Sequence, residues 1–263
     1  MTGTRLIGWP LVDLSRAPNG PRDRQLLMGE AVDLTDAPAP PSSSGLTRGS
    51  PPGWLRVRAR RDGYPGFVPE AALTPDTPVT HRVCARATHL YPAPDFKTQE
   101  RAMLSLGARL LVRGAADRFA ETPHGFVPRA HLAPLDVPET DPVAVAGRLI
   151  GTPYLWGGNS ALGIDCSGLV QVACLACGIP CPGDSAEQQA ALGAPLPEDA
   201  TLGRGDLLFW RGHVGWVADP GTLLHANAHH MAVAYEPLHD AIARIEAQGD
   251  GPVTARKRLR AAG

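Results

Sequence analysis

The chain has 263 residues, of which 43% are hydrophobic and 19% are charged, and its formal net charge is −1 at pH 7. This composition is typical of a soluble globular protein with enough sequence for one to three domains. A nearly neutral chain gives no electrostatic basis for binding nucleic acid or an anionic membrane, so neither partner is expected.

The targeting and redox signals indicate one compartment. The first ten residues lack the apolar core of a signal peptide, and no apolar run approaches the length of a membrane span. The chain has five cysteines, an odd number that gives no disulfide framework and suits a reducing compartment. We therefore expect a cytoplasmic protein.

The first part of the chain, residues 1–78, is rich in proline and glycine and contains short β-like runs. Strands are predicted over Gly29–Leu34, Trp54–Ala59 and Gly66–Pro69. The second run alternates apolar and basic residues, as a strand with one buried face does. Between these strands, Ala37–Gly45 has the proline and serine content of a loop.

Residues 79–138 repeat this pattern. Strands are predicted over Leu106–Arg113 and Arg118–Thr122, and the sequence Gly-Phe-Val-Pro of Gly66–Pro69 recurs at Gly125–Pro128. An internal repeat of about 60 residues made of short strands predicts two small β-barrels.

A proline-rich linker, Pro134–Pro142, leads into the last part of the chain, residues 139–263. Thr140 or Asp141 could cap a helix that has proline at its first position and runs through Val143–Ile150.

The glycine-rich loop Gly151–Gly168 delivers Cys166 between Asp165 and Ser167. The apolar run Leu169–Ala176 follows without glycine or proline and predicts a buried helix. Cys166 would therefore lie at or near the first turn, where unsatisfied N–H groups and the helix dipole favour a thiolate.

Downstream of the cysteine, histidines occur in two of three predicted strands. The strands are Gly205–Trp210, Gly212–Val217 and Leu223–Ala226, and a last strand with solvated charges is expected over Ala255–Arg260. His213 lies in the second strand and His225 in the third. A cysteine followed by a histidine and another polar group is the nucleophile, base and orienter arrangement of a cysteine hydrolase.

Four motifs, in this order, resemble the NlpC/P60 cysteine peptidases, which have a papain-like core and cut bacterial cell-wall peptides. They are Tyr154-x-Trp156-Gly157-Gly158, Asp165-Cys166-Ser167-Gly168, Gly205-Asp206-Leu207 and His213-Val214-Gly215. The resemblance implies an α+β fold with a papain-like catalytic domain over residues 139–263. The two repeats, 1–78 and 79–138, resemble the bacterial SH3-like domains that often precede such a domain.

The resemblance assigns roles to the residues of these motifs. Cys166 would attack the scissile carbonyl carbon, and His213 would accept the thiol proton and return it to the leaving amine. His225 would hold the imidazole of His213 in the useful tautomer. The backbone N–H of Cys166, helped by Tyr154 and supported by Ser167, would stabilise the oxyanion.

Other polar residues near these histidines are less suited to orient His213. Asn227 is a weaker orienter than His225, and His229 and His230 are expected at the surface. Trp156 and Asp165 are assigned to substrate binding.

A narrower resemblance, to the γ-D-glutamyl-L-diamino-acid endopeptidases, concerns substrate selection. Asp184 and Ser185 follow a proline-containing turn, as does the pair that binds the substrate's amino end and D-glutamate in that branch. The branch often has a basic residue where this chain has Gly183, which puts a contact there in doubt. In the first repeat, Glu30 after a glycine and Tyr64 in an Asp-Gly-Tyr turn match the residues that close the branch's site.

The carboxylates of Glu30 and Asp184 could pair with a free α-ammonium, because a buried cation needs partners. Tyr64 would wall off the site. The alternative is that Glu30 is a solvated strand charge and Tyr64 a hairpin aromatic.

The remaining cysteines favour no cofactor. Cys174, Cys177 and Cys181 have the spacing C-x-x-C-x-x-x-C, but a zinc site normally needs four ligands and no further Cys or His is close in sequence. A cysteine on a buried helix behaves as a small hydrophobic residue. We therefore expect structural thiols and neither a metal nor another cofactor.

The resemblance implies a peptidase that releases L-Ala-γ-D-Glu from the following diamino acid of murein-derived peptides with a free N-terminal L-alanine. Two alternatives stay open. One is a D,L-endopeptidase that acts on the intact wall, and the other is a wall-binding module with weak catalysis. The residues do not distinguish diaminopimelate from lysine in the substrate, and they predict no oligomeric state.

Overall fold

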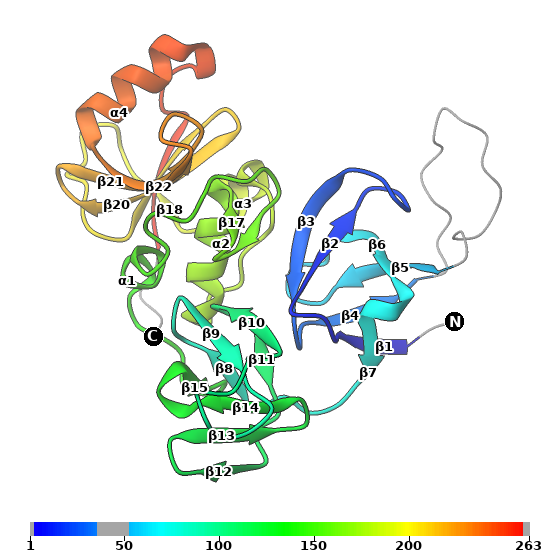
Figure 1. Cartoon of the computed structure of the whole chain (residues 1–263). Helices are drawn as coiled ribbons and strands as arrows, with labels where there is room; N and C mark the ends of the chain where they lie inside the picture. Colours follow the sequence, from blue (N-terminus) through cyan, green and yellow to red (C-terminus); the bar gives the residue numbers. More distant parts are fainter. Residues whose placement is uncertain (1–2, 36–52, 260–263) are drawn as a thin grey trace, which may run out of the picture. The chain divides into compact units, whose positions relative to one another are not determined.

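The structure is a computed structural model that describes residues 3–35 and 53–259. The loop expected at Ala37–Gly45 lies outside the described residues. The chain divides into two compact units, Met1–Val137 and Pro138–Gly263, the first built from strands and the second from a sheet with helices (Figure 1). Among the residues in these two ranges, no helix is long and apolar enough to cross a membrane.

The first unit begins with a seven-stranded antiparallel sheet in the order β3-β2-β6-β5-β4-β1-β7. The strands expected after Gly29, from Trp54 and around Gly66 are confirmed as β4, β5 and β6. The sheet comprises β1 (Gly3–Ile7), β2 (Leu11–Ser15), β3 (Arg22–Leu27), β4 (Ala31–Leu34), β5 (Trp54–Ala59), β6 (Pro65–Pro69) and β7 (Leu73–Pro75), with the 3-10 turn Glu70–Ala72 before β7.

One face of this sheet forms a hydrophobic core. Alternate positions of the strands supply it, among them Val12 and Leu14 of β2 and Val32 and Leu34 of β4. Burying one aliphatic side chain of this size contributes about 1.5–3 kcal/mol, so this face provides much of the driving force for folding.

The rest of the unit consists of shorter antiparallel ladders, β9 with β10, β11-β8-β15 and β12-β13-β14. Their bounds are β8 (His81–Val83), β9 (Ala87–Leu90), β10 (Ala102–Ser105), β11 (Arg109–Leu110), β12 (Gly114–Ala116), β13 (Phe119–Thr122), β14 (Gly125–Pro128) and β15 (Leu132–Pro134), with the 3-10 turn Arg129–His131 before β15. The architecture is α+β with β-rich sheets before the C-terminal unit, and closure of these sheets into barrels stays a prediction.

The two repeats share a hydrophobic cluster. Leu27 and Met28 from the first repeat pack with Val83, Leu104 and Leu110 from the second. The two repeats therefore share part of their core within one compact unit.

The strand predicted over Leu106–Arg113 is much shorter than expected, because only Arg109–Leu110 pairs with a neighbour, as β11. The chain turns just before it, where Ala108 donates its N–H to the carbonyl of Ser105 at 3.1 Å. Gly107 has φ +91°, a conformation that glycine tolerates and that interrupts an extended run.

The second unit begins with three helices. They are α1 (Pro142–Gly147), α2 (Cys166–Ala176) and α3 (Ser185–Ala191), with a small hairpin of β16 (Asn159–Ser160) and β17 (Gly163–Ile164) before α2. Asp141, not Thr140, caps α1, because its carboxylate accepts the N–H groups of Val143 and Ala144. The predicted α1 helix is confirmed, although its regular part ends at Gly147 and not at Ile150.

These helices accompany a six-stranded antiparallel sheet in the order β18-β23-β19-β20-β21-β22. The predicted strands are confirmed with slightly different ends. The sheet elements are β18 (Ala194–Pro195), β19 (Asp206–Trp210), β20 (His213–Asp219), β21 (Thr222–Asn227), β22 (Ala232–Pro237) and β23 (Ala255–Arg258), with helix α4 (Leu238–Ile245) and the turn Glu246–Asp250 between the last two.

Helix α4 lies against this sheet (Figure 1). Its residues Leu238, Ala241 and Ile245 pack on Leu208 and Leu223 of the strands. This spacing of apolar residues is the one-sided pattern of a helix on a sheet.

The C-terminal basic run is more than a solvated strand. Strand β23 lies inside the sheet, between β18 and β19. Arg258 donates from Nε and Nη2 to the two carboxylate oxygens of Asp206, both at 2.8 Å, and Asp206 is buried. Arg258 is exposed, as expected of a solvated charge, and its guanidinium at the same time compensates a buried carboxylate.

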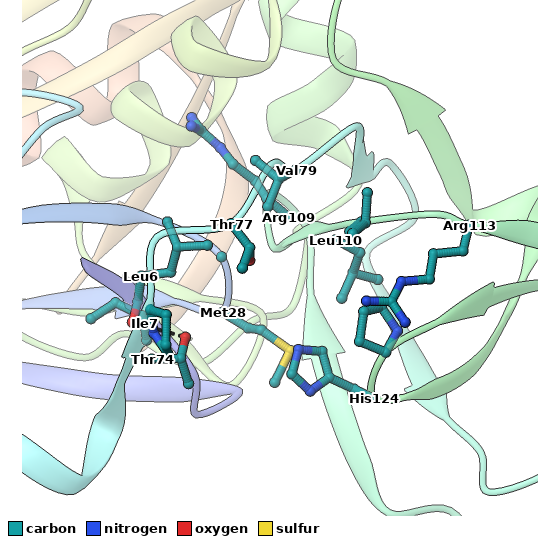
Figure 2. A pocket seen from close by; sticks show the side chains of 14 residues that line it. Leu6, Ile7, Met28, Thr74, Thr77, Val79, Arg109, Leu110, Arg113 and His124 are labelled. Carbon is teal, nitrogen blue, oxygen red and sulfur yellow. Dashed lines mark hydrogen bonds between the residues drawn. The ribbon is translucent and has the colours of Figure 1, made fainter. Parts of the chain in front are cut away.

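A cavity of about 220 Å³ opens in the first unit (Figure 2). Both repeats line it, with residues that include Leu6, Met28, Thr74, Leu110, Arg113 and His124. Neither Glu30 nor Tyr64 is among its lining residues, so it is distinct from the contacts predicted for the substrate.

The contact between the two repeats should be sensitive to a side chain at Gly29. Gly29 has φ +77°, and an added Cβ would lie 2.2 Å from the carbonyl oxygen of Arg109. Gly53 has a similar φ of +84°, and none of the described residues has an atom within 4 Å of an added Cβ there, which makes Gly53 a matched control. We expect Gly53→Ala to lower the free energy of unfolding by about 1 kcal/mol through backbone strain alone, and Gly29→Ala by about 2–4 kcal/mol.

Urea denaturation of the full chain measures both variants. Equal losses for Gly29→Ala and Gly53→Ala would contradict a close contact between the repeats at this point.

Candidate active site

Cys166 is the first residue of helix α2, as the sequence predicts, and its side chain is buried. Asp165 caps the helix, accepting the N–H of Gly168 at Oδ1 over 2.6 Å. The thiol thus lies at the positive end of the α2 dipole, a position that stabilises a thiolate.

Asp165 also ties the glycine-rich loop to the helix. Its Oδ2 accepts the N–H of Gly157 at 2.9 Å, and the hydroxyl of Ser167 donates to its Oδ1 at 3.2 Å. The loop and helix approach so closely that a Cβ on Gly168 would lie 2.4 Å from the carbonyl oxygen of Gly158. These contacts place Asp165 and Ser167 in the support of the cysteine, and a direct substrate contact by Asp165 stays a prediction.

The segment that leads into the first histidine lies next to the cysteine. The Sγ of Cys166 is 3.9 Å from the carbonyl oxygen of Gly212, the residue before His213. Nε2 of His213 lies 2.8 Å from Nδ1 of His225, so the structure brings together the two predicted histidines.

A carboxylate that the sequence analysis missed continues this row of hydrogen-bonded side chains. Nε2 of His225 lies 2.9 Å from Oε2 of Glu236 in β22. Arg244 of α4 donates from Nε to Oε1 at 2.8 Å and from Nη2 to Oε2 at 2.6 Å. The available signal was an acidic residue in a strand next to the one that carries His225.

The register of the sheet explains this row of side chains. His225 is paired with Ala234 and Leu223 with Glu236, so Glu236 is a diagonal neighbour of His225 on the same face. Val217 is paired with Leu223, and His213 has the same parity as Val217, which places all three polar side chains on one face.

Burial and fixed charges set the protonation of this row. Burial lowers the pKa of His225 to about 4, although the hydrogen bond to Glu236 acts in the opposite direction. Burial, followed by the charges of His225 and Arg244, also lowers the pKa of His213. The hydrogen bond from Arg244 lowers the pKa of Glu236 to about 2. At neutral pH the two imidazoles are therefore neutral and Glu236 is ionised.

Tyr154 is half-buried in the loop before the cysteine. Its pKa is raised by burial first, and then by negative charge at Cys166 and Asp165. The phenol stays protonated at neutral pH and can donate a hydrogen bond. Trp156, two residues on, has 73% of its surface exposed, which suits a residue that meets a ligand at the rim of the site.

Helix α3 presents Asp184 at its N-cap and Ser185 at its first position. Gln188 on this helix donates from Nε2 to the carbonyl oxygens of Ser167 and Pro182, both at 2.9 Å. The start of α3 is therefore bonded to the residue that follows Cys166, as the predicted role of Asp184 and Ser185 in substrate binding requires.

Glu30 and Tyr64 belong to the first unit. Glu30 has 5% of its surface exposed, accepts the N–H of Leu27 at 2.8 Å and receives Nη1 of Arg61 at 2.9 Å from each oxygen. Tyr64 packs on the core of the first sheet, with the guanidinium of Arg24 5.6 Å from its ring centroid. Glu30 is thus a buried, ion-paired carboxylate, and the substrate contacts of both residues stay predictions.

All five cysteines lie within the described ranges and are thiols. Cys174, Cys177 and Cys181 are buried, as expected for structural side chains. The contact with Cys181, followed by burial, raises the pKa of Cys174, which keeps that thiol protonated.

A different cluster has the composition of a metal site. Ligand atoms of His225, His230 and Glu236 lie within 4.8 Å of one another. A cation does not fit there, because the guanidinium of Arg244 already contacts both oxygens of Glu236, and both ring nitrogens of His225 have partners.

The expected surface position of the neighbouring residues is confirmed. His229 and His230 are exposed. Asn227 accepts the N–H of His230 at 2.8 Å and a ring contact from the same residue at 3.0 Å, so it does not replace His225 as the partner of His213.

Comparison with known proteins finds a family match over the part of the chain that carries this geometry. Residues 151–246, which include Cys166, His213 and Glu236, match the NlpC/P60 family. A γ-D-glutamyl-L-lysine dipeptidyl-peptidase of Bacillus subtilis (strain 168) is 29% identical over 188 residues, which cover 64% of this chain and 62% of that protein. A γ-D-glutamyl-L-lysine dipeptidyl-peptidase of Bacillus cereus (strain ATCC 10987 / NRS 248) is 25% identical over 244 residues, or 82% of this chain and 71% of that protein.

The fold is also shared with a solved structure. The crystal structure of an NlpC/P60 family protein from Bacillus cereus ATCC 10987 matches with a TM-score of 0.77 and 20% identity, covering 98% of this chain and 99% of that chain. This similarity extends over the β-rich first unit as well as the second. The segment that matches the NlpC/P60 family contains Cys166, His213 and His225, so the geometry described above lies within the matched residues.

Proposed function

We propose that the protein hydrolyses the bond between γ-D-glutamate and the following L-diamino acid in murein-derived peptides that have a free N-terminal L-alanine. The observation that carries the proposal is Cys166 at the start of α2, beside the segment that leads into the bonded pair His213 and His225. The similarity to γ-D-glutamyl-L-lysine dipeptidyl-peptidases supports the substrate class.

In the proposed reaction, the neutral imidazole of His213 accepts the proton of the Cys166 thiol while the sulfur attacks the scissile carbonyl carbon. The backbone N–H of Cys166 and the phenol of Tyr154 stabilise the oxyanion of the tetrahedral intermediate. The imidazolium of His213 then protonates the leaving amine, and an acyl-enzyme forms. A water molecule, deprotonated by His213, hydrolyses the acyl-enzyme and restores the thiol.

The proposed substrate contacts come from both units. Asp184 and Ser185 bind the amino end and the D-glutamate, and Trp156 forms a wall of the site. Glu30 is the second carboxylate for the α-ammonium, with Arg61 fixing its orientation, and Tyr64 closes the site behind the terminal alanine. This proposal takes the two repeats of the first unit as SH3-like barrels, of which the first completes the specificity site.

We further propose that the enzyme acts in the cytoplasm on imported murein peptides. The support is chemical, since five thiols without a disulfide suit a reducing compartment.

Replacing Cys166 by Ala should reduce turnover by about 10⁴-fold or more, because the covalent path is lost. Cys174→Ala is the matched control, since Cys174 is a buried thiol on the same helix and has no proposed role in the reaction. Cleavage of L-Ala-γ-D-Glu-diaminopimelate and of the corresponding lysine peptide is followed by mass spectrometry. Substantial turnover by Cys166→Ala would refute the assignment of the nucleophile.

The depressed pKa of His225 predicts a loss of stability on acidification. His225 has a pKa of about 4 in the folded protein, below its usual value, so the unfolded chain binds more protons as the pH falls. The stability that neutral, buried His225 contributes is fully present above about pH 6.5, and it is lost as the pH falls towards the pKa of His225 in the folded protein. Between about pH 7 and pH 5, wild type should lose on the order of 2 kcal/mol more unfolding free energy than His225→Asn.

Urea denaturation of both proteins at the two pH values gives this difference. In this window Glu236 stays ionised, so the comparison isolates the histidine. Parallel losses in the two proteins would mean that His225 is not buried in its neutral form.

The amino-end proposal is tested by acetylating the peptide. If Glu30 and Asp184 bind the α-ammonium in a site poor in water, acetylation should lower kcat/KM by about 30- to 1,000-fold. Glu30→Gln should narrow the ratio of kcat/KM between the free and the acetylated peptide, because one carboxylate that binds the α-ammonium is lost. A smaller fraction of folded protein would lower both rates equally and would leave this ratio unchanged. Asp33→Asn, in the strand β4 that follows Glu30, is the control that should preserve the ratio.

Equal cleavage of free and acetylated peptides would overturn the closed amino-end site. Cleavage of intact peptidoglycan at a comparable rate would favour the D,L-endopeptidase instead.

A further inference from the structure

We propose that Glu236, held by Arg244, sets the tautomers of both active-site histidines and thereby leaves the Nδ1 lone pair of His213 for the thiol of Cys166. Glu236 is a positioning residue in this scheme, because it acts through His225 and does not touch the reacting atoms. The inference rests on the proposed role of His213 as the base and adds a fixed end to the Cys–His–His arrangement.

The first step concerns the carboxylate. Both oxygens of Glu236 receive N–H donors from Arg244, at 2.8 and 2.6 Å. An ionised carboxylate accepts hydrogen bonds and cannot donate them. The guanidinium, which is also a pure donor, makes the ionised form the only one that satisfies this contact.

The second step fixes His225. Its Nε2 is 2.9 Å from Oε2 of Glu236, and the side chain has no exposed surface. Because Glu236 only accepts, Nε2 of His225 must carry the hydrogen. A neutral imidazole has a single N–H, so Nδ1 of His225 is an acceptor.

The third step passes this constraint to His213. Nδ1 of His225 and Nε2 of His213 are 2.8 Å apart. With an acceptor on the side of His225, Nε2 of His213 must be the donor, and the lone pair is then at Nδ1. That nitrogen is the one left to accept the thiol proton, so the direction of every hydrogen bond from Arg244 to His213 is determined.

The charges around the histidines indicate that the direction of the hydrogen bonds affects the base more than the net charge of Glu236 and Arg244 does. Besides the thiol of Cys166, the ionisable groups that act on this pair are Glu236 and Arg244, with His230 beside His225. The charges of Glu236 and Arg244 oppose each other, so their combined field at His213 is small. A neutral acceptor in place of Glu236 should therefore preserve most of the function.

Two substitutions of Glu236 distinguish the effect of losing its hydrogen-bond acceptor from the effect of losing its negative charge. Glu236→Gln keeps the acceptor for His225 and for Nη2 of Arg244 when its amide oxygen takes the place of Oε2, although its NH2 group then takes the place of Oε1 and loses the bond from Nε of Arg244. Glu236→Leu removes the acceptor. We expect kcat to fall less than about 10-fold for Glu236→Gln and about 100-fold for Glu236→Leu, with KM nearly unchanged in both.

The matched control is Asp206→Asn. Asp206 is a buried carboxylate of the same sheet, bonded side-on to Arg258 through Nε and Nη2 as Glu236 is to Arg244, but no histidine contacts it among the hydrogen bonds of the described residues. Loss of the Asp206 carboxylate in Asp206→Asn should lower the melting temperature about as much as Glu236→Leu does. It should leave kcat per folded molecule unchanged.

The decisive measurement is ¹⁵N nuclear magnetic resonance of histidine-labelled full-length protein without substrate. Spectra of His213→Asn and His225→Asn assign the two rings among the nine histidines. Wild type and Glu236→Gln should show protonated Nε2 and unprotonated Nδ1 in both rings, and Glu236→Leu should show mixed tautomers. A protonated Nδ1 on His213 in wild type, or unchanged tautomers in Glu236→Leu, would overturn the proposal.

Alkylation of Cys166 by iodoacetamide, followed by peptide mass mapping, tests the consequence for the thiol. The rate should fall at least about 10-fold in Glu236→Leu and remain near that of wild type in Glu236→Gln and Asp206→Asn. An equal fall in Asp206→Asn would reduce Glu236 to a general structural role and overturn the proposal. Neither measurement uses a peptide, so tautomers and alkylation as expected, without cleavage of murein peptides, would refute the proposed substrate alone.

Discussion

The active site depends on the capping of helix α2 by Asp165. One carboxylate accepts the N–H of Gly168, the N–H of Gly157 and the hydroxyl of Ser167. A buried carboxylate requires such donors, because its charge is costly without them. The same contacts therefore satisfy Asp165, begin the helix and hold the glycine-rich loop beside Cys166.

The sheet supplies the second half of the site through its register. Side chains that alternate along β20, β21 and β22 share one face, so residues distant in sequence form the row His213, His225 and Glu236. Arg244 reaches the end of this row from α4, which is anchored on the same sheet by its apolar side. The site thus stands on rigid elements, which limit the motion of the base relative to the thiol.

The first unit presents a different balance of forces. Its two repeats share apolar residues around Leu27 and Met28, so part of the core belongs to neither repeat alone. Glu30 lies directly after this contact, and its carboxylate is compensated by Arg61. If Glu30 binds an ammonium group, it does so as one member of a charged network, which makes the geometry of Arg61 as important as the charge of Glu30.

The sequence by itself determined the local features of the catalytic unit. The apolar run after Cys166 predicted α2, because this signal depends on short spacings. The pairing of His213 with His225 was implied by the resemblance of the motifs to the NlpC/P60 peptidases. The strand predicted over Leu106–Arg113 was too long, since a single turn at Gly107 ends an otherwise plausible β pattern.

Only the tertiary structure decided which charges meet. Glu236 and Arg258 resembled ordinary strand residues, and the pairing of strands and the packing of α4 turned them into partners of His225 and Asp206. The common core of the two repeats was hidden in the same way. Such contacts join residues far apart in the chain, and their cost or benefit exists only after folding has buried at least one of the partners.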